Sequence, residues 1–119
     1  TLRERKCLKP YIPQVDLDNA DLHDGEVPWY LGPGYRAITR GNDIYVRPGE
    51  YALGGIGLLG HELYHVGQYR QGKTWVDFVI EGLINGHDNS PLEIPAIALE
   101  LQIREDIQGP NGINCGCRK

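Results

Sequence analysis

The stretch GGIGLLGHELYHVGQYRQG, residues 54–72, determines how the rest of the chain can be interpreted. Its apolar residues recur at spacings of three, four and three, at Ile56, Leu59, Leu63 and Val66. This period predicts an amphipathic helix that runs to Gly72 after a flexible entry at Gly54 and Gly55. The same helix carries the pattern His-Glu-x-x-His at residues 61–65.

The two histidines of this pattern predict a metal site. His61 and His65 lie four residues apart, about 40° apart around a helix, so both imidazoles can bind one cation. Glu62 flanks the same opening, where it can accept a proton from a metal-bound water. We expect the apolar face of the helix to pack on the core and the histidine face to open onto a cleft. Two of the chain's four histidines fall in this pattern, which favours a metal site over a chance match.

A catalytic zinc site takes three protein ligands and one water, so a third ligand is needed. Gln71 excludes the subclass with a third histidine six residues after the second. Our best candidate is Glu93, which opens a later helix on the face of Ile97 and Leu101, a face that we expect to pack inward. A capping box with Ser90 is the alternative role for Glu93. The fallback ligands are Glu81, His87 and Glu100.

The flanking segments predict an α+β fold, in which a small β-hairpin or sheet precedes the active-site helix and two further helices. The hairpin spans Tyr35 to Val46, with turn residues at 41–43. The second helix starts at Trp75, with Thr74 as its cap and Trp75, Phe78, Val79 and Leu83 as its apolar positions. The third starts at residues 90–93 and buries a stripe made of Ile94, Ile97, Ala98, Leu101 and Ile107.

The first third of the chain predicts little regular structure. Pro10 and Pro13 suggest that residues 1–14 form an extended arm, and a short strand is possible at residues 15–17. The acidic stretch at residues 16–26 lacks the glycine and the terminal glutamate of a calcium loop. We therefore interpret it as a solvated acidic loop.

Length and charge exclude several functions. The 119 residues fit one domain, 1–119, with the arm at 1–14 and a cysteine-containing tail at 110–119. Acidic residues outnumber basic ones by 16 to 12, which argues against nucleic acid as the main partner. No apolar stretch is long enough for a membrane span. Since the chain begins with Thr1, we expect it to be processed or cut from a longer protein.

The cysteines and the helix glycines carry structural expectations. Cys7, Cys115 and Cys117 allow at most one internal disulfide, and we favour a bond from Cys7 to the tail over a soft-metal site. Gly57, Gly60 and Gly67 each cost a helix up to about 1 kcal/mol relative to alanine. We therefore expect these glycines to permit close approach of a neighbouring backbone.

Several segments together resemble the zincin-like core domain of bacterial extracellular contractile injection systems and related toxin-type proteins. They are residues 41–46, 48–49, 58–63, 65–66 and Gln68. The resemblance implies a zincin-like fold, Zn²⁺ at His61 and His65, and Glu62 as the catalytic glutamate. The segment around Glu93 looks like the glutamate-bearing helix of glutamate-ligand zincins.

The motif and the resemblance lead to two hypotheses. The first is a zinc metallopeptidase that hydrolyses a peptide or protein substrate, as an effector, toxin or processing domain of a larger bacterial protein. The second is a non-catalytic zinc-stabilised scaffold or binding module in an injection or toxin assembly, with the parent protein or secretion-system components as partners. A domain without metal is a third, weaker one. A secreted or delivered protein is favoured over a cytoplasmic one.

The peptidase hypothesis needs two further features. A second electrophile would stabilise the oxyanion, and the candidates are Tyr64, Tyr69, Tyr35 and His87. An extended peptide could pair with the predicted strand at residues 42–46.

Overall fold

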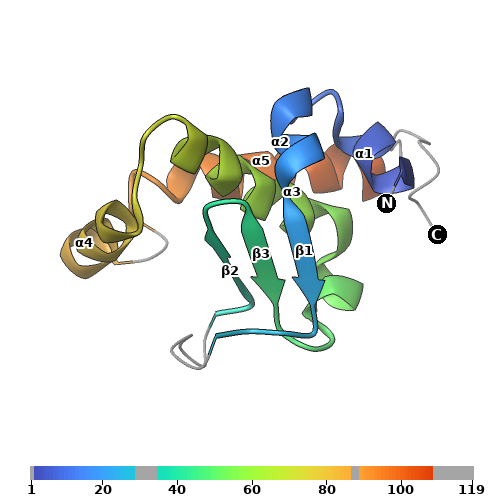
Figure 1. Cartoon of the computed structure of the whole chain (residues 1–119). Coiled ribbons are helices and arrows are strands. Elements are labelled where there is room, and N and C mark those ends of the chain that lie inside the picture. The colour runs from blue at the N-terminus through green and yellow to red at the C-terminus, as the bar shows by residue number, and fades with distance from the viewer. Residues whose placement is uncertain (1, 29–34, 87–88, 109–119) are drawn as a thin grey trace.

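The computed structural model describes residues 2–28, 35–86 and 89–108, and it has an α+β fold, as predicted. A three-stranded sheet contacts the long central helix α3 (Glu50–Arg70), which also contacts α5 (Ile94–Ile103). Figure 1 shows α3 running behind the strands, with α4 (Trp75–Asn85) at one end of the molecule and α1 (Leu2–Leu8) at the other. The central helix is therefore covered from more than one side.

The sheet contains the predicted hairpin and one strand that was not expected. Strands β2 (Ala37–Arg40) and β3 (Asp43–Val46) are antiparallel, and Gly41 in the turn between them has a φ of 63°. Strand β1 (Asp21–Asp24) pairs with β3 in parallel, which places β3 in the middle of the order β1-β3-β2. The expectation that a peptide pairs with residues 42–46 is therefore wrong, because β3 is paired along both sides. The edge strands of the sheet are β1 and β2.

The expectations for the first third of the chain are wrong in three places. Helix α1 replaces the extended arm, because Pro10 lies beyond the end of the helix and constrains only its own φ and the residue before it. Helix α2 (Gln14–Asn19) replaces the strand at residues 15–17. Pro13 stands immediately before α2, where it breaks nothing. The acidic stretch is not a loop, since α2 and β1 occupy most of it.

Helix α3 starts earlier than predicted and is kinked at the glycines. Gly55 has φ 59° and ψ −143°, a backbone conformation outside the helical region that glycine adopts at little cost. The part after Gly55 is the predicted helix, and the turn before it was missed. Close approach of a neighbouring backbone is confirmed for Gly57, whereas Gly60 and Gly67 face the side chains of Ile103 and Asp16. A Cβ added to Gly57 would lie 2.8 Å from Cγ of Arg104 and 3.3 Å from the carbonyl oxygen of Glu100.

Both the apolar face and the histidine face of α3 are buried. Leu63 is 4% exposed and Val66 is 0% exposed, whereas His61 and His65 are each 4% exposed. In the part of the chain that the structure describes, the histidine face is therefore buried and does not open onto the expected cleft. The physical reason is that the sheet contacts this helix from one direction and α5 contacts it from another. The core also takes residues from the chain ends, with Leu8, Ile12 and Ile107 in the same buried cluster.

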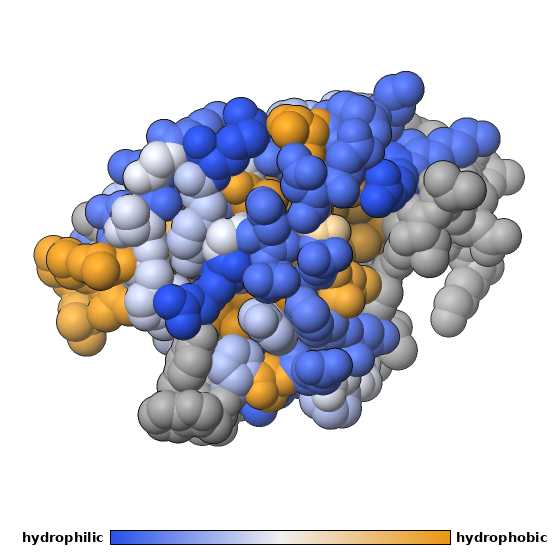
Figure 2. All heavy atoms as spheres, viewed as in Figure 1, coloured by the Kyte–Doolittle hydropathy of each residue, from blue (hydrophilic) through white to orange (hydrophobic). Residues whose placement is uncertain are grey.

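Helix α4 has the predicted start and an exposed apolar face. The hydroxyl of Thr74 accepts a hydrogen bond from the backbone N–H of Asp77, so the predicted cap is confirmed. Val79 and Leu83, expected to pack inward, are exposed; the exposed apolar residues of α4 are Val76, Val79, Ile80, Leu83 and Ile84. They form the apolar patch at the left edge of Figure 2.

Helix α5 buries a different stripe from the predicted one, except that Ile107 is buried as predicted. Ile94 and Leu101 are 53% and 59% exposed. The inward stripe is Glu93, Ala96, Glu100, Ile103 and Ile107, of which the last lies in the π-helical turn η1 (Arg104–Gln108). Apolar periodicity failed here because two of the buried positions are glutamates, whose partners lie elsewhere in the chain.

The two ends of the described chain lie against each other. The hydroxyl of Tyr11 donates a 2.7 Å hydrogen bond to Asp106 of η1, and Cys7 is buried in the core. Cys115 and Cys117 lie outside the described residues, so a disulfide from Cys7 to either one stays a prediction. Within the described residues, none of the helices has the length and apolarity needed to cross a membrane.

Candidate metal centre

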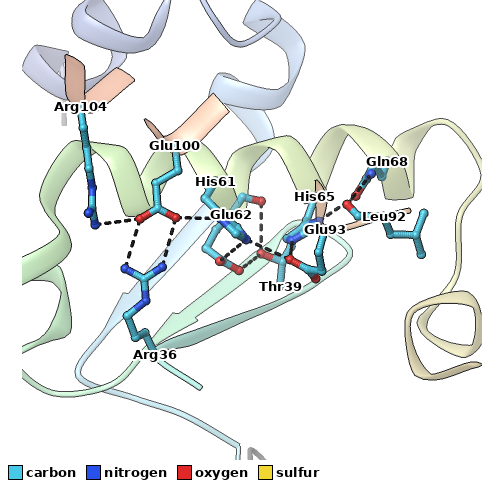
Figure 3. Close-up of polar contacts among 10 residues, drawn as sticks. All are labelled: Arg36, Thr39, His61, Glu62, His65, Gln68, Leu92, Glu93, Glu100 and Arg104. Atoms are coloured by element: carbon cyan, nitrogen blue, oxygen red, sulfur yellow. Dashed lines mark hydrogen bonds and ion pairs between the residues drawn. The ribbon is translucent and has the colours of Figure 1, made fainter. Parts of the chain in front are cut away.

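Two histidine nitrogens of α3 and one carboxylate oxygen from the start of α5 lie close together. The carboxylate atom Oε1 of Glu93 lies 3.0 Å from Nε2 of His61 and 2.9 Å from Nε2 of His65. The histidines come from adjacent turns of α3, and Glu93 is the residue that directly precedes α5. All three side chains are buried. The pair of histidines and the third candidate ligand predicted from the sequence are therefore brought together (Figure 3).

The other nitrogen of His61 is held by a buried carboxylate. Nδ1 of His61 lies 2.8 Å from Oε1 of Glu100. Arg36 binds the same carboxylate with two nitrogens, at 3.1 and 3.2 Å, and Arg104 binds it at 2.7 Å. Glu100 was a fallback ligand in the sequence analysis, and the structure places it one layer behind the histidine. Although burial opposes it, hydrogen bonds from His61 and Arg36 lower the pKa of Glu100 to about 2.

The other nitrogen of His65 is held by an amide. Nδ1 of His65 lies 2.7 Å from Oε1 of Gln68, and Nε2 of Gln68 donates a 3.0 Å hydrogen bond to the backbone carbonyl of Leu92. Leu92 directly precedes Glu93 in the chain. Gln68 therefore contacts one candidate ligand directly and the neighbour of another.

These contacts fix the tautomers of both histidines. An ionised carboxylate only accepts hydrogen bonds, so Nδ1 of His61 carries a proton toward Glu100. The amide oxygen of Gln68 likewise only accepts, so Nδ1 of His65 carries a proton too. In the neutral imidazoles, both Nε2 lone pairs then point at Oε1 of Glu93. Three acceptors that face one another need a proton or a cation between them.

In the metal-free protein a proton takes this place. Burial lowers the pKa of His61, but hydrogen bonds to Glu100 and Glu93 and the charges of Glu62 and Glu93 outweigh it and raise the pKa to about 10. A charged His61 is then the hydrogen-bond donor to Glu93. A metal ion would replace that proton.

The donor set suits Zn²⁺. Two imidazole nitrogens and one carboxylate oxygen form one of the usual three-ligand sets of catalytic zinc sites. Bond lengths of 2.0–2.2 Å in a tetrahedral site separate the donor atoms by about 3.3–3.6 Å, so the contacts of 2.9 and 3.0 Å found here would have to lengthen by a few tenths of an ångström. Nδ1 hydrogen bonds to Glu100 and Gln68 are the outer support that metal-binding histidines normally have.

Glu62 lies beside the two histidines, but its carboxylate is farther from their nitrogens than that of Glu93 is. Its Oε1 accepts a 2.9 Å hydrogen bond from the hydroxyl of Thr39, and its Oε2 lies 3.7 Å from Nε2 of His61. Donor atoms of His61, Glu62 and His65 all lie within 4.8 Å of one another, so Glu62 also belongs to this cluster of potential ligands. Glu93 Oε1 lies closer to the Nε2 atom of His61 than Glu62 does, and it also contacts His65, so Glu93 is the better-placed candidate for a third ligand.

The remaining predicted site residues have mixed outcomes. Tyr69 stacks on Phe78 of α4, with ring centroids 5.0 Å apart, and Phe78 meets the edge of the His65 ring at 5.1 Å. Tyr64 is half-buried on α3, and Tyr35 is 41% exposed. His87 and the side chain of Glu81 lie outside the described part of the structure. The role of a tyrosine or of His87 toward an oxyanion stays a prediction.

Sequence reasoning missed the partners that hold the site. These residues are Arg36, Thr39, Gln68 and Arg104. Two of them had a signal in the sequence. Thr39 lies two residues after Ala37 and so shares its face of the strand, where a polar residue stands out. Gln68 lies three residues after His65 and so shares its helix face. The two arginines had none, because a flexible side chain can reach many places.

Comparison with known proteins gives one match. The model of a family described as the eCIS core domain matches residues 13–73, which are 61 of the 119 residues. The match includes the sheet and all of α3, and it ends before Glu93 and Glu100. No curated protein and no solved structure is similar enough to count as a match.

Proposed function

Since this chain belongs to the eCIS core domain family, we propose that it is a zinc-dependent metallopeptidase domain of an injection-system-related protein, with His61, His65 and Glu93 as ligands and Glu62 as the general base. The finding that supports catalysis is the position of Glu62. A buried carboxylate is costly unless it is partnered, and Thr39 partners only one side of this one by a hydrogen bond. The other oxygen lies beside the metal ligands. A purely structural site has no need of it.

The chain's own residues divide the chemistry among them. A zinc ion bound at this site supplies a water with a pKa near 7 and a Lewis acid that polarises a carbonyl. Glu62 accepts the proton of the attacking water at Oε2 and passes it to the leaving amine. Thr39 keeps Oε1 of Glu62 fixed, so that the same oxygen always faces the reaction. Glu100 and Gln68 hold protons on the Nδ1 atoms of the histidines, so that the Nε2 atoms are the ones directed toward the point where the ion would bind.

The edge strand β2 is the place for an extended substrate. Among the described strands it pairs with β3 alone, and its residue Thr39 contacts Glu62 directly. A peptide added along β2 would gain backbone hydrogen bonds next to the general base.

The test is Glu62→Gln beside the matched variant Glu105→Gln, whose glutamate is exposed on η1. We expect Glu62→Gln to retain one zinc per chain and to lose cleavage of a peptide library by at least about 100-fold, the range in which a general base contributes. Glu105→Gln should match the wild type in both. Cleavage that survives in Glu62→Gln and disappears on chelation would contradict the role of Glu62.

A structural zinc site is the second candidate, and the burial of the site favours it. Each of His61, Glu62 and His65 is at most 5% exposed. In such a site the metal ties α3 to the start of α5 and contributes folding free energy. A zinc-loaded wild type that cleaves no member of the library, together with a fourth protein ligand in X-ray absorption spectra, would establish this function instead.

The family also supports the wider context. We propose a protein that is secreted or delivered by a bacterial secretion system and acts within a larger assembly as an effector, toxin or processing domain. Its partners would be a peptide or protein substrate, its parent protein or components of the secretion system. Fractionation of the producing bacterium with an antibody against this domain tests the first part.

A further inference from the structure

We infer that Gln68 is a positioning residue that sets the distance between His65 and Glu93 and so pre-forms the metal site across two helices. The inference concerns the metal site of the proposed function and does not require hydrolysis.

The need for such a residue follows from the connectivity. His61 and His65 keep their mutual distance because they belong to one helix. Glu93 lies 28 residues beyond His65, on a segment that α3 does not control through its backbone. A contact between the two segments at this end of α5 must therefore hold Glu93 in place.

Gln68 makes this contact with both ends of its amide. The carbonyl of Leu92 is an acceptor, so it requires the NH₂ group of Gln68, and this fixes the orientation of the amide. Oε1 of Gln68 then faces Nδ1 of His65 and accepts its proton. One side chain thus selects the His65 tautomer and holds the residue next to Glu93.

The segment at residues 90–93, which Gln68 contacts, is held by its own hydrogen bonds. The backbone N–H of Leu92 donates to the hydroxyl of Ser90, and the N–H of Glu93 donates to the Ser90 carbonyl. Ser90, Leu92 and Gln68 are all buried. A displacement of the Leu92 carbonyl therefore moves Glu93 as well.

The neutral amide also differs from the support of His61. Glu100 carries a charge, and two arginines neutralise it. Gln68 accepts the hydrogen bond from Nδ1 of His65 without adding a carboxylate next to Glu62 and Glu93. The two histidines are therefore oriented by separate residues, which permits one to be disturbed while the other serves as an internal reference.

The test uses Gln68→Met, which keeps the length of the side chain and loses both hydrogen bonds. Its matched control is Gln71→Met, the same change at an exposed position one turn farther on. Zn²⁺ affinity is measured against a competing chelator, and the tautomers of His61 and His65 are read by nitrogen NMR of the metal-free protein. We expect zinc affinity to fall about 10–100-fold in Gln68→Met, the range found for outer-shell partners of metal-binding histidines.

The tautomers separate positioning from general stability. In Gln68→Met, His65 should lose its preference for the proton on Nδ1, while His61 keeps its own state and Gln71→Met resembles the wild type. If Gln68→Met does not fold, Gln68→Asn, which is one methylene too short to reach both partners, gives the same readouts. Unchanged zinc affinity with an unchanged His65 tautomer would overturn the inference. A wild type that binds zinc but cleaves nothing would instead overturn the peptidase proposal alone.

Discussion

Thr39 on the edge strand β2 donates a 2.9 Å hydrogen bond to Oε1 of Glu62 on α3, and both side chains are buried. The residue that we propose as the general base is thus held by the strand on which we propose that the substrate lies. Binding of a peptide along β2 and the orientation of Glu62 are therefore physically connected.

Thr39→Val tests this connection, because valine has nearly the same shape as threonine and lacks the hydroxyl. We expect zinc content to be unchanged and kcat to fall about 10–100-fold, since a hydrogen bond to a charged group is worth about 1.5–3 kcal/mol. Steady-state kinetics on a cleaved peptide measures this. An increase in KM with an unaltered kcat would show that Thr39 serves substrate binding and not the base.

Glu93→Gln is expected to remove zinc while leaving the helices intact. The amide keeps the size of the side chain but is a poor ligand, so we expect zinc affinity to fall by more than the 10–100-fold range of outer-shell changes. Metal analysis after dialysis against a weak chelator measures the loss, with the exposed Glu26→Gln as control. Full zinc retention in Glu93→Gln would remove Glu93 from the ligand set.

Glu100→Gln is expected to lower both stability and zinc affinity. The change leaves Arg36 and Arg104 without the carboxylate that they share. Both arginines are more than one-third exposed, so water compensates part of the loss. We therefore expect the free energy of unfolding to fall by about 1–3 kcal/mol. Urea titrations with and without a chelator separate the two effects. A variant that loses neither stability nor zinc would contradict the orienting role of Glu100.

The two shifted pKa values predict how stability depends on pH. The pKa of Glu100 is lowered from 4.5 to about 2, so its contribution is complete above about pH 4.5 and is lost as the pH falls through 2. The pKa of His61 is raised from 6.5 to about 10, so its contribution is complete below about pH 6.5 and is lost as the pH rises through 10. For these two groups, the metal-free protein is most stable between those limits.

Zinc should reverse the alkaline part of this trend, because zinc and the proton compete for His61. Melting temperatures of chelator-treated and zinc-loaded protein, measured at intervals between about pH 6 and 9, should therefore diverge as the pH rises. A constant difference across this range would mean that zinc binding releases no proton from His61.

Gly57→Ala is expected to destabilise the protein, although alanine favours a helix by about 1 kcal/mol. The added Cβ would lie 2.8 Å from Cγ of Arg104 and 3.3 Å from the Glu100 carbonyl oxygen, so the Arg104 side chain must shift and the backbone of α5 must yield by a few tenths of an ångström. We expect a net loss of about 1–3 kcal/mol in thermal or chemical unfolding. A stabilised variant would show that α5 can retreat from α3 without cost.

The positions of the candidate ligands could be predicted from the sequence, whereas the residues around them could not. The spacing of His61 and His65 follows from helix geometry alone, and the position of Glu93 at a helix start was also visible in the sequence. The burial of the histidines was not visible, because it depends on how closely α5 approaches the glycines of α3. Glu100 did not fit the apolar pattern because its buried charge depends on His61 and Arg36, which lie 39 and 64 residues away, as well as on the nearby Arg104.

Errors in the secondary structure also have physical causes. Pro10 and Pro13 gave a strong local signal, yet each lies outside a helix and disturbs none. Strand β1 carries Asp21, His23 and Asp24 and therefore looked like a loop. It forms because β3 offers it a parallel partner, and this long-range pairing leaves no trace in local composition.

The separation of the ligands along the chain gives the metal site a place in the order of assembly. His61 and His65 can be brought together by α3 alone, but the third donor arrives only after a further 28 residues have been made and the start of α5 has docked. Tight binding of a metal ion at this site would therefore be a late event, and it would report that the start of α5 has docked on α3. In this molecule a bound ion would stabilise a tertiary structure that has already formed, and it would not nucleate folding.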